Sequence, residues 1–105
     1  MTVQFNTGKN IAGSEEFTAP IIALISEELG RFSSQITRVE VHLTDEDSNK
    51  DSLNDKRCLL EARLAGMKPI VVSNNADSVD QAVEGALEKL KTSLDTILGR
   101  LSNHH

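Results

Sequence analysis

The chain has 105 residues, 38% of them hydrophobic, and a formal net charge of −5 that comes from 16 Asp and Glu against 11 Lys and Arg. This length suits one domain with one core, and the negative charge repels polyanions on average. The aromatic residues are three Phe, with no Tyr or Trp, which argues against a nucleic-acid surface built on stacked bases.

The first predicted elements are a strand and a helix. Apolar and polar residues alternate over Thr2–Thr7, which is typical of a short strand. A helix start follows at Ser14, a candidate N-cap. Pro20 lacks the N–H donor that a helix interior needs, so either the helix begins at Thr18 or its opening turn is bent. One side of this helix is apolar except for a single Glu, and consists of Phe17, Ile21, Leu24, Ile25, Glu28 and Phe32.

Three further strands are predicted in the middle of the chain. Ile36–Thr44 and Arg57–Leu64 alternate apolar with polar side chains, which gives each strand one buried and one solvated face. The acidic segment Thr44–Asp55 between them is expected to be a mobile, surface-exposed loop. Gly66 marks a tight turn before the last strand, Lys68–Ser73.

The C-terminal part of the chain predicts a long amphipathic helix over Ser78–Leu101. The segment Ser73-Asn74-Asn75-Ala76 leads into it, and Asp77 or Ser78 can cap its start with a side-chain oxygen. The apolar residues recur at steps of three and four, which places them on one face. They are Val79, Val83, Ala86, Leu87, Leu90, Leu94, Ile97, Leu98 and Leu101.

The element order β-α-β-β-β-α predicts an α+β fold, a two-layer sandwich in which two helices pack on one face of a four-stranded sheet. The core is expected to contain Val39, Val41, Cys58, Leu60, Ile70, Val83, Leu87 and Leu90. The other face of the sheet is left to solvent, and its mixed charges suit cross-strand ion pairs. This open face carries Arg38, Glu40, His42, Arg57, Glu61 and Arg63.

Residues that could support catalysis or hold a metal are few. The histidines are His42, on the solvated face of a predicted strand, and His104 and His105 near the end of the chain. Cys58 falls on the buried face of its strand, away from His42, so we interpret it as a core residue. We therefore expect no enzyme, no cofactor, no metal and no small-molecule substrate.

The sequence also indicates the cellular compartment. The single Cys58 cannot form an intramolecular disulfide, which suits a reducing cytoplasm. No apolar run approaches the ~20 residues that span a bilayer, and no secretory signal is visible. We expect a cytoplasmic protein with no membrane partner.

Three motifs resemble a known family. They are Cys58-Leu-Leu-Glu-Ala-Arg-Leu-Ala-Gly66, Pro69-Ile-Val-Val72 and Gln81-Ala-Val-Glu-Gly-Ala-Leu-Glu-Lys-Leu90, in this order. Together with the element order they resemble the ribosome hibernation family, which comprises hibernation-promoting and ribosome-associated inhibitor proteins and is also called the sigma-54 modulation group. The resemblance covers roughly Val3 to Leu101 and is to the short form, which lacks the long form's C-terminal dimerisation domain. It implies a single domain over residues 1–105.

The resemblance implies a fold like a double-stranded-RNA-binding domain and a non-enzymatic regulator. Members dock on the 30S ribosomal subunit, in the decoding channel where mRNA and tRNA would sit, and hold idle ribosomes inactive. Lys and Arg on their two helices contact 16S rRNA phosphates. The matching candidates for rRNA binding here are Lys89, Lys91, Arg31 and Arg100, with Arg63 and Arg57 on the open sheet face.

An alternative stays open because Arg31 is the only cation of the first helical region. The chain could be a diverged member that acts as a protein-interaction or homo-oligomeric module, with weak or no RNA binding. The candidate cations could likewise belong to ion pairs, Lys91 with Glu88 or Asp95 on the helix and the sheet arginines with their neighbouring glutamates. A contiguous positive patch joining Arg31, Lys89 and Lys91 favours RNA, whereas interspersed signs favour a protein partner.

Overall fold

The computed structural model describes residues 1–7, 14–45 and 55–102, with the side chains of 100–102 outside that description. The predicted order of strands and helices is confirmed, with a short 3-10 turn, η1, after the first helix. The elements are β1 (Thr2–Thr7), α1 (Glu15–Glu28), η1 (Gly30–Phe32), β2 (Ile36–Asp45), β3 (Lys56–Leu64), β4 (Ile70–Ala76) and α2 (Val79–Ser102).

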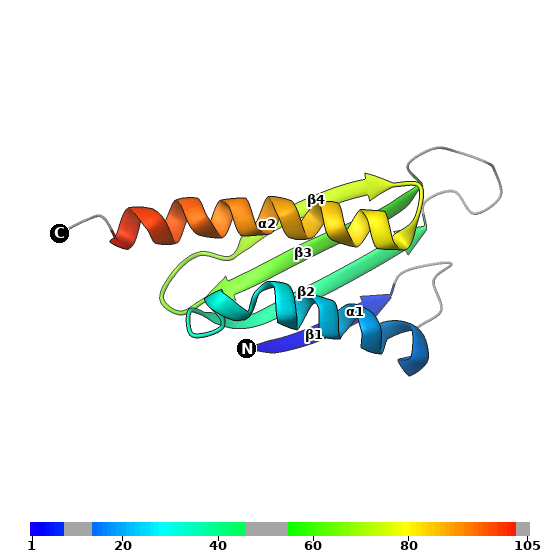
Figure 1. The fold of residues 1–105 in the computed structure, drawn as a ribbon, viewed down its shortest axis with the longest axis horizontal. Helices are drawn as coiled ribbons and strands as arrows, with labels where there is room; N and C mark the ends of the chain where they lie inside the picture. Colours follow the sequence, from blue (N-terminus) through cyan, green and yellow to red (C-terminus); the bar gives the residue numbers. More distant parts are fainter. Residues whose placement is uncertain (8–13, 46–54, 103–105) are drawn as a thin grey trace.

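The four strands form one sheet in the order β1-β2-β3-β4, with both helices on one face (Figure 1). β1 runs parallel to β2 because α1 forms the crossover between them, whereas β2, β3 and β4 are antiparallel neighbours. The register places Val41 beside Leu60 and Leu60 beside Val72, so apolar side chains line up across the sheet. The predicted two-layer α+β sandwich is confirmed.

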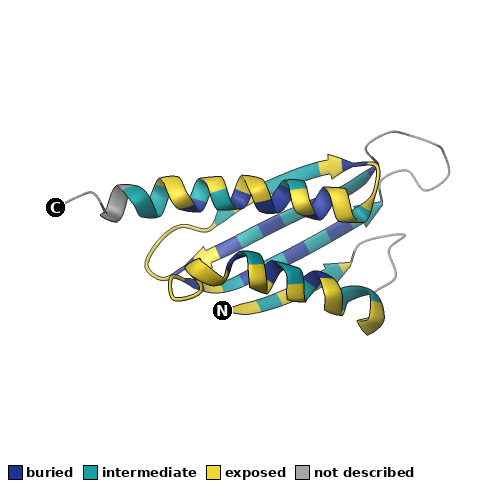
Figure 2. Ribbon diagram, viewed as in Figure 1, coloured by how far each residue is buried: buried dark blue, intermediate teal, exposed yellow. Residues whose placement is uncertain are grey.

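Packing between the sheet and the helices forms one aliphatic core. α2 lies over β3 and β4, and α1 lies over β1; buried residues follow the central strands and parts of both helices (Figure 2). The prediction for Ile70 is wrong in degree: it is only partly buried, because it begins the outer strand β4. The other predicted core residues are all buried: Val39, Val41, Cys58, Leu60, Val83, Leu87 and Leu90.

Pro20 does not delay the first helix. Of the two alternatives, a start at Thr18 is wrong, since α1 begins at Glu15 with Pro20 inside it. Ser14 is the N-cap as expected, and its Oγ accepts a hydrogen bond from the Phe17 N–H at 3.4 Å. The carbonyl that Pro20 leaves without a helical donor belongs to exposed Glu16, where water can replace the missing bond.

The last strand ends later than the sequence predicts. Asn74 and Asn75, expected in a connection to the long helix, belong to β4 and pair with Cys58 and Arg57 of β3. Asn has a low strand propensity, but the ladder to a well-formed neighbour outweighs it. The helix N-cap is Ser78, whose Oγ accepts from the Gln81 N–H at 3.2 Å.

The segment predicted as an exposed loop, Thr44–Asp55, is described at its two ends only, because residues 46–54 lie outside the described part of the chain. These ends are not exposed. Asp45 belongs to β2, and Asp55 is 9% exposed. Lys56 Nζ lies 3.1 Å from Asp55 and 3.3 Å from Asp45, and its pKa is raised, chiefly by the hydrogen bond to Asp55. This ion pair is what allows two carboxylates to lie so close to the core.

The buried thiol of Cys58 provides a first test of the core. Burial raises its pKa to about 12, so the thiol stays protonated and unreactive at neutral pH. We expect the folded protein to react with a thiol reagent such as DTNB far more slowly than the same protein in denaturant. Because the unfolded thiol ionises near 9.0, its burial should favour unfolding increasingly as the pH rises from 9.0 towards 12. Rapid stoichiometric labelling of the folded protein would contradict this burial.

Candidate nucleic-acid interface

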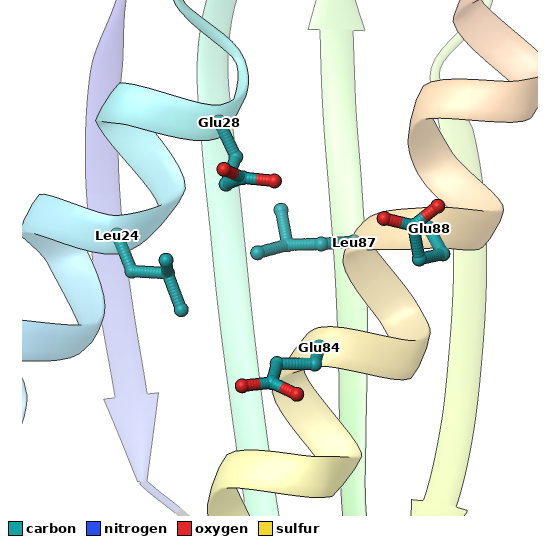
Figure 3. Close-up of a pocket in the computed structure, with 5 residues that line it drawn as sticks. All are labelled: Leu24, Glu28, Glu84, Leu87 and Glu88. Atoms are coloured by element: carbon teal, nitrogen blue, oxygen red, sulfur yellow. The ribbon is translucent and has the colours of Figure 1, made fainter.

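A groove runs between the two helices on the surface where the family resemblance places the RNA contacts. Leu24 and Glu28 of α1 and Glu84, Leu87 and Glu88 of α2 line this hollow of about 280 Å³. Leu24 and Leu87 point toward one another from the two helices, and the three carboxylates stand around them (Figure 3). An apolar floor with an acidic rim disfavours phosphate at this place.

The acidic rim could have been recognised in part from the sequence. Glu28 interrupts the apolar side of the first helix, and Glu84 and Glu88 are four residues apart, a spacing that puts them on one helix face. Sequence reasoning missed that the two sets meet, because the relative rotation of α1 and α2 is fixed by packing on the sheet.

Two of the predicted rRNA-binding cations are held by carboxylates next to this groove. Lys91 Nζ lies 2.8 Å from Glu28 Oε1 and 3.2 Å from Glu88 Oε1, and the hydrogen bond to Glu28 is the main cause of its raised pKa. Arg31 donates to both carboxylate oxygens of Asp95, at 2.9 and 3.0 Å, and lies over the ring of Phe32. These contacts compete with any phosphate for the same donors.

Lys89 points to the other flank of α2. Its Nζ donates to the backbone carbonyl of Ser73 in β4 at 2.7 Å, whereas Lys91 faces α1. The described side chains therefore do not form a contiguous positive patch joining Arg31, Lys89 and Lys91; positive and negative groups alternate. The side chain of Arg100 lies outside the described residues.

The open sheet face is dominated by ion pairs, as the alternating signs predict. Arg38 pairs with Glu40 at 3.0 Å, and Arg63 pairs with Glu61 at 3.1 Å and with Glu40 at 3.5 Å. His42 Nε2 lies 3.9 Å from Glu40, at the margin of this network. The predicted pairing is confirmed for Arg38 and Arg63.

The pairing prediction is wrong for Arg57. In the part of the chain that the structure describes, this guanidinium has no ion-pair or hydrogen-bond partner. It lines a shallow hollow of about 110 Å³ together with His42, Thr44 and Leu59. In the register Arg57 lies between Thr44 and Asn75, away from Glu40 and Glu61, which is why the glutamates do not reach it.

The described residues hold no group of three or more His, Cys, Asp or Glu that could bind a metal ion. Cys58 is buried on the helix side of β3, whereas His42 is on the open face of β2, so the two cannot act as a nucleophile and base. None of the described helices is long and apolar enough to cross a membrane.

Comparison with solved structures defines the class of fold. A ribosomal subunit interface protein from Coxiella burnetii is 20% identical, with 94% of this chain and 99% of that chain covered and a TM-score of 0.69. The N-terminal domain of Thermus thermophilus Protein Y is 16% identical, with 92% and 99% covered and a TM-score of 0.72. At these identities the likeness establishes the shared α+β fold.

The family is established by the sequence itself. The sequence profile of the family described as Sigma 54 modulation protein / S30EA ribosomal protein matches residues 6–102. The chain belongs to this family, which confirms the resemblance carried by the strand and helix motifs. No curated protein matches the chain.

Proposed function

We propose that the chain is a ribosome-associated translation regulator of the hibernation-factor type. It binds the small ribosomal subunit through 16S rRNA in the decoding channel and blocks the channel to mRNA and tRNA. The observation that carries this proposal is membership of the S30EA family over residues 6–102. The matching fold of a ribosomal subunit interface protein supports it.

The shape of the chain suits a mechanism of occupancy. Its principal extents are 53 × 26 × 20 Å, and the long helix α2 runs along the longest dimension (Figure 1). Occupying a channel requires only a rigid body and sufficient affinity, so this function needs no catalytic group. The phosphate contacts remain to be assigned among Lys89, Lys91, Arg31, Arg100, Arg63 and Arg57.

The proposal is tested by co-sedimentation with purified 30S subunits in sucrose gradients, at low and at physiological salt. We expect the protein to migrate with 30S subunits and to leave them when mRNA and initiator tRNA are added in excess, because all three occupy one channel. Binding should weaken as salt rises, since phosphate contacts release counterions. No co-sedimentation at low salt, or binding that mRNA and tRNA leave unchanged, would count against this function.

A protein-interaction or oligomeric module is the second candidate, and the groove between α1 and α2 favours it. Its three carboxylates and the ion-paired state of Lys91 and Arg31 make this surface unsuited to RNA. Sedimentation equilibrium of the protein alone distinguishes the two candidates. A stable oligomer that does not bind 30S subunits supports the module; a monomer that binds them supports the regulator.

A further inference from the structure

We propose that the RNA strand bound by this chain lies along the outer edge of β4 and the adjoining flank of α2, with its phosphates on Lys68, Lys89 and Arg57, and not in the groove between the helices. This inference rests on the proposed function, because it names the surface that would face rRNA. Three independent features of the structure carry it.

The first feature is the distribution of carboxylates around α2. The flank toward α1 carries Glu84, Glu88 and Asp95, which line the groove or pair with Arg31. The flank toward β4 is the one where Asn74 donates to the Gln81 and Ala82 carbonyls and Lys89 reaches Ser73. None of the α2 residues that make these contacts with β4 is acidic. A polyanion approaching α2 is therefore repelled on one flank and not on the other.

The second feature is which cations are free of carboxylates. Among the described side chains, Arg31, Arg38, Lys56, Arg63 and Lys91 all pair with Asp or Glu. Lys68, Lys89 and Arg57 have no such partner in that part of the chain. A cation without a carboxylate partner binds phosphate without first giving up an ion pair. These three cations therefore bind phosphate with the smallest loss of existing interactions.

These three cations are spread along the length of β4, with Lys89 on the helix side of the sheet and Arg57 on its open face, so a bound RNA strand would pass around the free edge of β4. Lys68 precedes β4 in the β3–β4 turn, Lys89 contacts Ser73 near the middle of β4, and Arg57 is paired with Asn75 near its end. At about 3.3 Å per residue, the seven residues of β4 extend roughly 20 Å, which is long enough for several phosphates. We call the set Lys68, Lys89 and Arg57 the track; it follows the length of β4.

The third feature is the backbone at this edge. Among the described strands only β3 lies beside β4, so the other side of β4 offers backbone N–H donors of the kind that bind phosphate. Lys89 covers the Ser73 carbonyl, an acceptor that would repel phosphate, and an ammonium has two further N–H donors for a ligand. Val71, 56% exposed, adds an apolar contact for a base.

The test uses fluorescence anisotropy with a short labelled single-stranded RNA and gradient co-sedimentation with 30S subunits. The triple variant Arg57→Gln/Lys68→Gln/Lys89→Gln removes the track. The matched control Arg31→Gln/Arg38→Gln/Lys91→Gln removes three ion-paired cations and lowers the net charge equally. Circular dichroism and thermal unfolding establish that both variants fold.

We expect the track variant to lose affinity for the RNA by roughly 10-fold or more at low salt, and its slope of log affinity against log salt to fall by about 2, since each single-strand phosphate contact adds about 0.7. The control should keep most of its affinity and its slope. Equal losses in the two variants, or no loss in the track variant, would overturn the inference. So would self-association through the β4 edge without any RNA binding.

A variant with an added positive charge tests the inference even if the triple variant does not fold. Thr96 is exposed and lies seven residues, or about 10 Å, beyond Lys89 along α2. Thr96→Lys should tighten RNA binding about 3-fold at low salt, whereas Ser26→Lys on exposed α1 should change it little. If both variants bind equally well, the track is wrong. If the RNA results hold but the wild type does not co-sediment with 30S subunits, the proposed function fails and the track stands.

Discussion

Replacing Leu90 with alanine is expected to lower the free energy of unfolding by about 2–5 kcal/mol. Leu90 is fully buried on the face of α2 that packs against the sheet. The substitution removes buried methyl groups and leaves a cavity between α2 and the strands, which the close-packed neighbours fill only in part. The measurement is equilibrium urea unfolding, and the midpoint should fall with an unchanged slope.

The matched control is Val71→Ala. Val71 is 56% exposed on the outer strand, so its truncation should change the free energy of unfolding by no more than about 0.5 kcal/mol. If Leu90→Ala were as mild as Val71→Ala, α2 would not be packed on the sheet in the way described. A stability of about 5–15 kcal/mol is usual for such a domain, so the Leu90 variant should unfold at a clearly lower temperature than the wild type.

Much of this fold follows from periodicity. The alternation through Val39, Val41 and Leu43 specifies one buried face for β2, and the three- and four-residue spacing of the long helix specifies the face that covers it. Such patterns are local, so they can be read without knowing what each element touches. The rejected alternative at Pro20 and the error at Asn74 have the opposite origin: the chain tolerates both residues because of solvent exposure and tertiary contacts.

The candidate interface follows less directly from the sequence. The charge of Lys91, Lys89 and Arg57 is evident from residue type, but their partners are not. Lys91 meets Glu28 from 63 positions away, and Lys89 meets a backbone carbonyl of β4. Only the packing of α2 between α1 and β4 decides that one lysine is neutralised and the other is left with its charge uncompensated.

Replacement of Gly85 by alanine is the second large effect we expect, because Gly85 of α2 lies directly against the Asn74 side chain of β4. A Cβ there would collide with the side-chain amide of Asn74. That amide donates to the carbonyls of Gln81 and Ala82, at 3.3 and 3.4 Å. Asn74 would have to turn away, which costs about 1–3 kcal/mol for a partly buried amide that loses its partners.

Alanine also favours a helix over glycine, by about 0.8–1.0 kcal/mol. The net result for Gly85→Ala should therefore be a loss of up to about 2 kcal/mol. In the Asn74→Ala background the collision is absent, and the same substitution should instead stabilise the protein by up to about 1 kcal/mol. This change of sign is measured by urea unfolding of the four proteins in a double-mutant cycle.

Gly99→Ala supplies the control, because a Cβ at that position of α2 meets nothing within 4 Å and only the helix preference should act. The cycle also bears on the RNA surface, since Lys89 follows Gly85 by four residues, about one helical turn. If Gly85→Ala lifts this turn from β4, Lys89 loses the Ser73 carbonyl and RNA affinity should fall with stability. Gly99→Ala should leave RNA affinity unchanged. A stabilising Gly85→Ala in the presence of Asn74 would mean that the amide does not hold α2 against β4.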